Sequence, residues 1–368
     1  MSQQPPLTAL VLSGGVALGA FEAGIYAALE EAGGPSPAWL AGASAGAVNA
    51  AIIAGNPPGQ RVARLREFWR SLSDDPAPAF SLLFGPPAPG PWRRAHNRIA
   101  ALQTLLLGRP GLFTPRMGLA AMIGEAPGLY DLSPLRRRLP ELIDFDRLNS
   151  GTPRLSLVAT DIVTGERVVF DTKGGGRIGP EHVAASCALP PLFAPVEIGG
   201  RLLGDGGLAS NAPLDLVLEE PSDGDVLCFV AELFSAPGQQ PRSLSASLSR
   251  AGDLAFGNQT QRILDGYART LKLRTALSRL LAELPEDKRD DIAGLLTEAG
   301  GAASATVVRI GYRAAPDEAG IGKLFDFSRA SINDRWEEGA RCMREALRRL
   351  TAAPAGPAPG LTLHDVDA

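Results

Sequence analysis

Ser44 lies between Gly42 and Gly46 in a Gly-x-Ser-x-Gly pattern. Residues 39–42 predict a short strand before it, and the small residues from Ala45 onward predict a helix after it. In this context the glycines leave room for a tight turn, which can hold a serine in a strained conformation with its hydroxyl clear of the sheet. We therefore predict that Ser44 is a nucleophile; the alternative is a turn that serves packing alone.

A second glycine-rich turn, with Gly14, Gly15 and Gly19, follows a strand-like segment and precedes a predicted amphipathic helix. Backbone amides in such a turn, like those at a helix N-terminus, bind anions. A nucleotide phosphate is disfavoured, because the turn lacks the Gly-Lys-Ser/Thr of a Walker A motif and Val16 interrupts the dinucleotide pattern Gly-x-Gly-x-x-Gly. The anion that fits better is the oxyanion formed when Ser44 attacks a carbonyl.

Asp205 is the third candidate, and it stands before Gly206 and Gly207 in a turn that follows the strand-like residues 201–203. An aspartate in such a turn is most often a structural turn residue. It gains interest here because a nucleophilic serine needs a base, and glycines leave the carboxylate accessible.

The three histidines of the chain are poor candidates for that base. His96 falls in a Pro-rich insertion and His364 in the C-terminal tail, whereas His182 lies near the start of a predicted helix. A Ser44–Asp205 dyad accounts for this scarcity directly. The alternative is a conventional Ser-His-Asp triad, which would require His182 to reach Ser44.

The composition indicates a folded globular protein rather than a disordered or fibrous chain. The 368 residues are 45% hydrophobic and 21% charged, enough to bury a full core. A net charge of −4 provides no global attraction for nucleic acid, which we exclude as a partner. Three scattered cysteines without a CxxC pair, and the lack of HExxH, argue against a disulfide framework and a zinc site. We expect no metal and no other cofactor.

The N-terminus has no Lys or Arg before its first apolar run, so it lacks the basic region of a secretory signal, and we expect a cytoplasmic protein. Residues 32–60 contain no charged residue. Pro35, Pro37 and the small residues of this stretch nevertheless favour a buried strand, turn and helix over a membrane span.

The elements that must position the candidate residues follow a βαβα order within the first 55 residues, which is typical of an α/β fold with a mostly parallel central sheet. Beyond residue 243 the sequence becomes helical. The expected layout is a catalytic domain at 7–235 with a Pro-rich, apolar insertion at about 74–130, a mainly helical C-terminal region at 243–350 that packs on it, and a flexible tail at 351–368.

The insertion carries apolar and basic residues that could form a lid or contact a membrane surface. These residues are Phe80 to Phe84, Trp92, Leu105 to Leu107, Leu112 and Phe113, with Arg93, Arg94 and Arg98. Peripheral membrane association is therefore compatible with the sequence. The alternative is that the apolar residues are buried under the C-terminal helices and the arginines form a solvated face.

Together the three motifs resemble the patatin-like phospholipase family, whose pattern is a strand, a glycine-rich oxyanion loop, a Gly-x-Ser-x-Gly elbow and a later Asp-Gly. The resemblance covers roughly residues 7–231, including VATD at 158–161 and ASCALPPLF at 185–193. It implies a three-layer patatin-like fold. It also implies that Ser44 is the nucleophile, that Asp205 is the general base, and that the glycine-rich turn donates to the oxyanion.

This chain departs from the family's GGGxRG loop, because Val16 replaces the third glycine and Leu18 replaces the arginine. Valine is β-branched and avoids positive φ, so a turn that needs such a conformation there must be reshaped. Loss of one oxyanion donor costs about 10²–10³ in turnover. A catalytically weakened protein that binds lipid or acts as a scaffold is therefore the alternative to an active hydrolase.

The residues and the resemblance predict a serine acyl hydrolase that cleaves lipid esters through an acyl-enzyme. Asp205 would accept the Ser44 proton, and because an ordinary aspartate has a pKa of about 3.9, we expect it to be desolvated. The expected oxyanion donors are the amides of Gly14, Gly15, Val16 and Ala45. The sequence does not separate phospholipid, lysophospholipid and acylglycerol substrates, and it does not indicate an oligomeric state.

Overall fold

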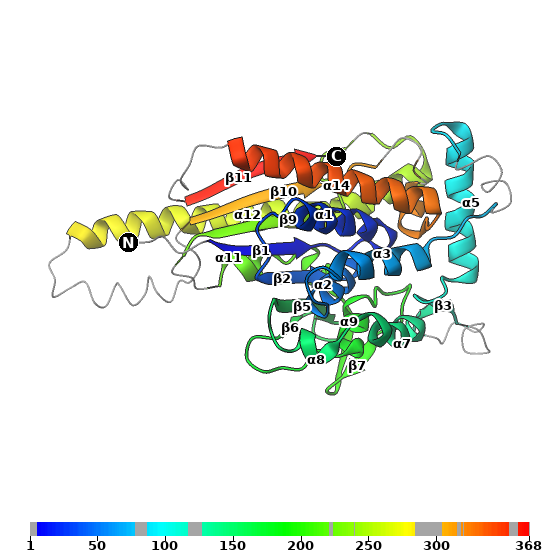
Figure 1. Cartoon of the computed structure of the whole chain (residues 1–368), viewed down its shortest axis with the longest axis horizontal. Coiled ribbons are helices and arrows are strands. Elements are labelled where there is room, and N and C mark those ends of the chain that lie inside the picture. Colours follow the sequence, from blue (N-terminus) through cyan, green and yellow to red (C-terminus); the bar gives the residue numbers. More distant parts are fainter. Residues whose placement is uncertain are drawn as a thin grey trace.

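The computed structural model describes residues 6–77, 87–116, 127–220, 224–238, 240–283, 304–314, 318, 320–352 and 360–367. Within them, nine strands form one sheet in the order β11-β10-β9-β1-β2-β5-β8-β7, and β6 also pairs with β5. Helices cover both faces of this sheet (Figure 1). The predicted three-layer α/β fold with a mostly parallel sheet is confirmed.

The strands of the large sheet are β1 (Leu7–Leu12), β2 (Trp39–Ala43), β5 (Arg154–Asp161), β6 (Arg167–Asp171), β7 (Val196–Ile198), β8 (Arg201–Asp205), β9 (Val226–Glu232), β10 (Ser304–Gly311) and β11 (Gly360–Asp367). A separate antiparallel pair joins β3 (Thr114–Pro115) to β4 (Tyr130–Asp131).

The described helices are η1 (Val16–Leu18), α1 (Gly19–Glu31), α2 (Ala45–Ala54), α3 (Arg61–Leu72), α5 (Pro91–Leu107), α7 (Ser133–Leu142), α8 (Phe145–Leu148), α9 (Pro180–Ser186), α10 (Gly207–Ser210), α11 (Leu214–Leu218), α12 (Leu244–Glu283), η3 (Gly320–Phe325) and α14 (Arg329–Ala352).

Strands β9, β1, β2 and β5 run parallel, so their carboxyl ends meet at one edge of the sheet. The turns after β1 and β2 are the two glycine-rich turns of the sequence. Strand β8 runs antiparallel to β5 and aligns Asp205 with Ala159. The topology therefore brings all three sequence motifs to the same edge.

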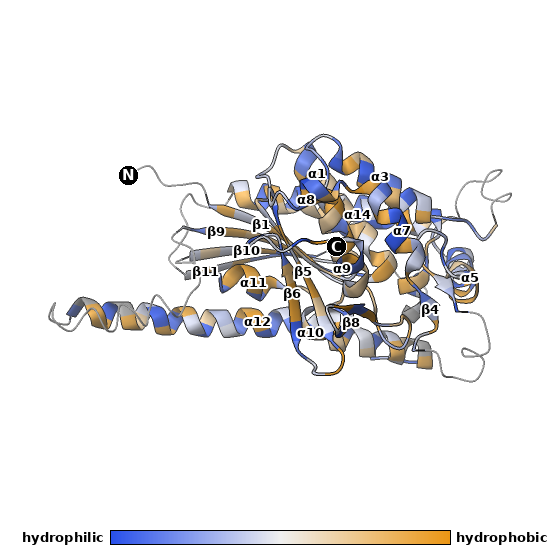
Figure 2. Ribbon diagram, turned by 90° about the horizontal axis from the view of Figure 1, so that it is seen from below, coloured by the Kyte–Doolittle hydropathy of each residue, from blue (hydrophilic) through white to orange (hydrophobic). Residues whose placement is uncertain are grey.

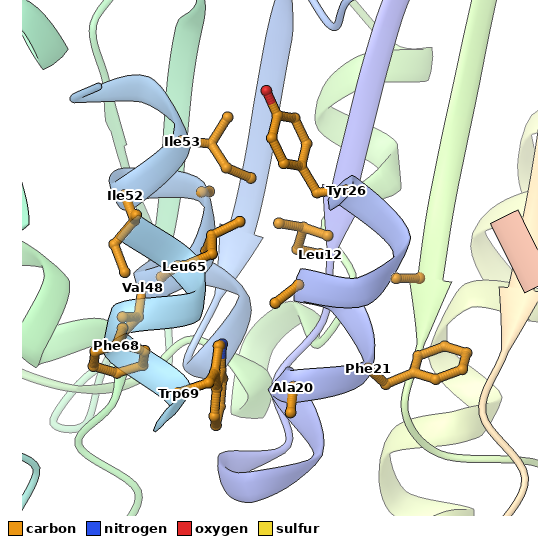
Figure 3. Close-up of a cluster of buried hydrophobic side chains, with 14 of the residues drawn as sticks. Leu12, Ala20, Phe21, Tyr26, Val48, Ile52, Ile53, Leu65, Phe68 and Trp69 are labelled. Carbon is orange, nitrogen blue, oxygen red and sulfur yellow. The ribbon is translucent and has the colours of Figure 1, made fainter. Parts of the chain in front are cut away.

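The alternation of side chains along β1 divides the core between the two faces of the sheet. Leu10 and Leu12 pack on the face covered by α1, α2 and α3, where Figure 3 shows Leu12 among apolar side chains of these helices. Ala9 and Val11 point to the opposite face and pack with residues of α11 and α12, and Figure 2 shows α12 lying along that face. These two layers of buried apolar side chains form the main hydrophobic core.

Helix α14 covers α1 at very close range, and two glycines permit this approach. A Cβ on Gly24 would lie 2.0 Å from the Trp336 carbonyl oxygen, and one on Gly339 would lie 1.9 Å from that of Phe21. Because α1 is buried along nearly its whole length, it needs such a cover. The C-terminal helix is therefore part of the core that supports the first glycine-rich turn.

The C-terminal part of the chain differs from the expected layout in two respects. The region 243–350 contains strand β10, and residues 360–367 form strand β11 where we expected a flexible tail. β10 pairs in parallel with both β9 and β11, so this region extends the sheet as well as packing helices on it. The apolar residues Leu361, Leu363 and Val366 supply the reason, although the Ala-Pro-Gly composition before them conceals it.

The expected insertion at 74–130 contains α5, β3 and β4, and part of it enters the core. Phe113 is fully buried and Tyr130 nearly so. Phe80 to Phe84, which the sequence analysis considered for a lid, lie outside the described residues.

Candidate active site

Ser44 occupies the turn between β2 and α2, and its backbone has φ 53° and ψ −120°. Glycines make this turn possible: a Cβ on Gly42 would lie 2.6 Å from the Gly46 carbonyl oxygen, and one on Gly46 would lie 2.3 Å from that of Leu12. The Ser44 side chain is 7% exposed. The strained serine that the local pattern predicts is thus present at the carboxyl edge of the sheet.

Asp205 ends β8, and the strand register places it beside Ser44. Ala43 pairs with Val158 on one side of β5, and the next residue, Ala159, pairs with Asp205 on the other. The Ser44 hydroxyl is a hydrogen-bond partner of the Asp205 carboxylate. The two predicted side chains therefore meet across β5.

Burial raises the pKa of Asp205 from 3.8 to about 6, and the hydrogen bonds from Ser44 and from the Gly207 amide oppose this shift. The Gly207 N–H donates to Asp205 Oδ1 at 2.7 Å. The Thr160 hydroxyl and the Ala188 carbonyl fix the Asp205 backbone at 2.8 and 2.9 Å. Glycine is needed next to it, because a Cβ on Gly206 would lie 2.1 Å from the Val158 carbonyl oxygen. The result is a fixed carboxylate that can hold a proton near neutral pH.

The first glycine-rich turn lies against Ser44, with only part of the expected set of amides available. A Cβ on Gly14 would lie 2.6 Å from Asn211 Oδ1 and 3.0 Å from the Ser44 Cβ. The Gly14 amide donates to the backbone carbonyl and to the side-chain oxygen of Asn211, both at 3.1 Å. We predicted this amide as an oxyanion donor, and the structure instead commits it to Asn211.

The amides of Gly15, Val16 and Ala45 have no hydrogen bond to the described part of the chain. Val16 has φ 51°, in the region that valine avoids, and this is the position where the sequence lacks the expected glycine. Two residues of the cavity wall, Val16 and Ser44, thus both have a positive φ, which residues with a side chain disfavour. Gly19 is also constrained, since a Cβ there would lie 2.8 Å from the Trp69 ring.

Sequence reasoning gave no role to the polar side chains that hold these turns in place. The Ser44 amide donates to Ser186 Oγ at 3.0 Å, and Ser186 Oγ donates to the Val158 carbonyl at 2.6 Å. The backbone N–H of Asn211 donates to Gln259 Oε1 at 2.7 Å. This hydrogen bond ties the turn to α12. Ser186 lies within the motif ASCALPPLF and Asn211 lies four residues beyond Gly207, but their partners are far away in the sequence.

Glu22 is a fully buried acid beneath the first turn. Its Oε1 accepts from the Ser13 amide at 2.6 Å, and its Oε2 accepts from Asn49 Nδ2 at 3.0 Å. Burial raises the pKa of Glu22 well above its usual value. Trp69 Nε1 donates to Asn49 Oδ1 at 3.0 Å, so this network links α1, α2 and α3 under the candidate site.

Arg335 of α14 reaches the same turn from the C-terminal region. It is 2% exposed, and its guanidinium donates to the carbonyls of Ala17 at 3.2 Å and Asp326 at 3.0 Å. Leu18, the residue after Ala17, is fully buried. The loop that lacks its own arginine is therefore held by an arginine more than three hundred residues away.

An apolar cavity of about 40 Å³ opens beside Ser44. It is lined by Val16, Ser44, Ala45, Val48, Phe68, Trp69, Leu72, Leu112, Phe113, Leu132, Cys187 and Phe193. This volume holds only a few water molecules, so a long acyl chain requires its walls to move. The lining suits an apolar group attached to a carbonyl that reaches Ser44.

The histidines occupy other places in the structure. Gly179 N–H donates to His182 Nδ1 at 2.9 Å, and the His182 ring packs on Phe170 at 4.5 Å. His96 lies 2.6 Å from Asp75, and His364 lies in β11. Within the described residues, no histidine forms a hydrogen bond with Ser44 or Asp205.

The described residues contain no group of three or more His, Cys, Asp or Glu placed to hold a metal ion. None of their helices combines the length and the apolar character needed to cross a membrane.

Comparison with known families gives two matches. The family model described as patatin-like phospholipase matches residues 10–218, which is more than half of the chain. A second model, described as patatin phospholipase, matches residues 254–354.

Individual relatives match more weakly. Uncharacterized NTE family proteins of Mycobacterium bovis and Mycobacterium tuberculosis are 37% identical over 71 residues, which is 19% of this chain and 11% of theirs. VipD from Legionella pneumophila is 18% identical with a TM-score of 0.43, covering 94% of this chain and 68% of VipD. The ExoU–SpcU complex of Pseudomonas aeruginosa contains a chain that is 20% identical with a TM-score of 0.29, covering 81% of this chain and 59% of that one.

Proposed function

Because this chain belongs to the patatin-like phospholipase family, we propose that it hydrolyses carboxylic esters of lipids through a Ser44–Asp205 dyad. The observation that supports this most strongly is the strand register that places Ser44 beside Asp205, a buried carboxylate whose pKa is raised to about 6. Such a carboxylate is ionised at neutral pH, yet basic enough to accept a proton.

In the proposed first step, Ser44 Oγ attacks the ester carbonyl while its proton passes to Asp205. The tetrahedral intermediate then expels the alcohol, which takes the proton from Asp205, and the acyl group stays on Ser44. Water attacks the acyl-enzyme with Asp205 again as base, which releases the fatty acid and restores Ser44. The backbone bonds that hold Asp205 keep the carboxylate directed at Ser44 through both steps.

We propose that the amides of Gly15, Val16 and Ala45 stabilise the oxyanion, and that Gly14 has a different role. These three amides have no hydrogen bond to the described residues, and Ala45 begins α2, whose N-terminus favours negative charge. Gly14 permits the close approach of Asn211 to the turn. The Asn211 side chain then sets the position of the loop from which the neighbouring amides donate.

The apolar lining beside Ser44 favours an ester whose acyl chain is apolar over an ester whose acyl group is polar. We therefore assign the substrate to lipid esters as a class, which includes phospholipids, lysophospholipids and acylglycerols. The small size of the cavity leads us to expect that long chains enter after side-chain movement at its mouth.

The test is hydrolysis of an acyl-ester series of increasing chain length, with a phospholipid included, by the wild type and by Ser44→Ala. Ser150→Ala, an exposed serine in a turn, is the matched control. We expect the wild type and the control to turn over the esters, and Ser44→Ala to lose about 10³–10⁶ in kcat. Turnover that survives in Ser44→Ala would refute the proposal. A folded wild type that is inactive at every chain length would favour a weakened, lipid-binding protein.

A further inference from the structure

Helix α5 exposes a row of large apolar side chains although it belongs to a folded domain. Their exposed fractions are 75% for Trp92, 50% for Ile99, 55% for Leu102, 66% for Leu106 and 73% for Leu107. Positions 92, 99, 102 and 106 recur at helical spacing, so these side chains form one stripe along the 17-residue helix. We call them the α5 stripe. A contiguous apolar stripe of this kind marks an interaction surface.

The opposite face of α5 is firmly attached to the protein body, so the exposure is not an effect of a loose helix. Arg93 donates to Asp334 at 2.6 Å and to Asn97 at 3.1 Å. His96 pairs with Asp75 at 2.6 Å, and Thr104 is 1% exposed. The α5 stripe therefore has a fixed outward direction.

The charges on α5 point to a particular kind of surface. The helix contains no acidic residue, and the exposed Arg94 and Arg98 lie along one side of the stripe. Neither arginine has an ion pair with the described residues. A row of Trp, Ile and Leu bordered by cations matches an anionic lipid surface, in which apolar side chains enter the acyl boundary and arginines meet phosphates.

The helix also leads directly into the candidate active site. The Tyr130 hydroxyl is hydrogen-bonded to the Leu105 carbonyl. Leu112 and Phe113, which follow the helix, line the cavity beside Ser44. Figure 1 shows α5 at one end of the long axis, whereas the far end of α12 projects at the opposite end.

We propose that the α5 stripe docks this protein on an anionic phospholipid bilayer, which places the Ser44 cavity next to its substrate. This inference rests on the proposed function for the nature of the substrate. The other occupant to consider is a second copy of the chain. Pairing of two α5 stripes would bring the arginines of both copies together without acidic partners on either helix, which disfavours it.

The test compares wild type, Leu106→Glu and Leu273→Glu for sedimentation with vesicles of phosphatidylcholine mixed with phosphatidylglycerol. Leu273 is the matched control, because it is 67% exposed and lies on α12. We expect wild type and Leu273→Glu to bind, and Leu106→Glu to lose about tenfold in partitioning. Binding should also weaken with added salt and with vesicles of phosphatidylcholine alone.

Trp92 provides an independent readout. Its indole is exposed, whereas Trp39 and Trp69 are buried and Trp336 is half-buried against Arg66, so insertion should shift the emission to the blue, and Trp92→Phe should remove that shift. Turnover of a soluble short-chain ester, measured in parallel, should be equal in all variants.

Vesicle binding that is equal in wild type and Leu106→Glu would overturn the docking proposal, as would a wild type that binds no vesicles. A lipid-free dimer that Leu106→Glu converts to a monomer would assign the stripe to self-association instead. Failure of the proposed function looks different, because it would abolish turnover of the soluble ester and leave vesicle binding intact.

Discussion

The two turns that meet at the candidate site solve the same conformational problem in different ways. Ser44 has φ 53° and Val16 has φ 51°, and both residues line the apolar cavity. The Ser44 turn depends mainly on its own glycines, because Gly42 and Gly46 allow close backbone packing, and one remote side chain, Ser186, accepts a hydrogen bond from its amide. The Val16 turn lacks the corresponding glycine, and remote residues hold it instead.

Three side chains support the Val16 turn, and two of them are remote in the sequence. Asn211 bonds to Gly14 and Arg335 to Ala17, whereas Glu22 bonds to Ser13 from the helix that follows the turn. A strained conformation persists only where the surroundings over-determine it. A local motif thus encodes most of one turn of the candidate site, whereas tertiary contacts hold the other turn.

We expect the largest effect from replacing Asp205, the proposed general base for Ser44. Asp205→Asn keeps a side-chain oxygen for the Gly207 amide but cannot accept a proton. We expect kcat/KM to fall by about 10³-fold, measured with a soluble ester. His182→Ala should retain activity, since His182 contacts Gly179 and Phe170. The opposite pattern, with His182 essential and Asp205 dispensable, would establish the triad.

The next effect is expected from the remote supports of the Val16 turn. Asn211→Ala removes the side-chain oxygen that accepts from the Gly14 amide, so the loop loses part of its anchor. We expect kcat to fall about tenfold to a hundredfold with a smaller change in KM, because oxyanion amides act in the transition state. Asn258→Ala on α12 is the control. Unchanged kcat in Asn211→Ala would show that the turn needs no remote support.

The pH dependence of turnover tests the electrostatics of the dyad. Because burial raises the pKa of Asp205 to about 6, the carboxyl is protonated below that pH and cannot act as base. We expect kcat/KM to rise with pH, to level off above pH 7, and at pH 5 to be about a tenth of the plateau. A plateau that extends to pH 4 would mean that this carboxylate does not control the reaction.

The raised pKa of Asp205 also predicts that its ionised carboxylate destabilises the folded protein. Because the folded-state pKa is raised above the unfolded value, the contribution of Asp205 to stability is fully present below pH 3.8 and is lost as the pH rises through about 6. Asp205→Asn should therefore raise the free energy of unfolding by about 1–3 kcal/mol at pH 8. In urea unfolding this gain should shrink toward zero at pH 4. A destabilised variant at pH 8 would show that the charge is well compensated.

We expect the smallest effect from replacing Val16 itself. Val16→Gly removes the strain of the positive φ, which stabilises the folded state. It also loses apolar contact and gives the unfolded chain more entropy, and both effects destabilise the fold. We therefore expect the free energy of unfolding to stay within about 1 kcal/mol of wild type. Val48→Gly, in a helix lining the same cavity, should cost about 3 kcal/mol or more. Thermal melts of both variants provide the measurement. Equal destabilisation would mean that the Val16 backbone carries no strain.

The sequence predicted the residues of the short motifs, but it could not predict the distant residues that hold the Val16 turn. Ser44, Asp205 and their glycines form short patterns between elements of clear periodicity, so local reasoning could select them as candidates, and the structure brings both to the carboxyl edge of the sheet. The partners Asn211 and Arg335 are polar residues without a local signal, and their bonds to the first turn form only once the sheet and α14 assemble. Strand β11 was missed because it follows a Pro-rich segment.

The most direct test of the dyad is covalent labelling with a fluorophosphonate, read by mass spectrometry of peptides. The account predicts an adduct on Ser44 in wild type, none in Ser44→Ala, slow labelling in Asp205→Asn, and wild-type labelling in His182→Ala. Absence of an adduct in folded wild type, or loss of labelling in His182→Ala with retention in Asp205→Asn, would contradict it.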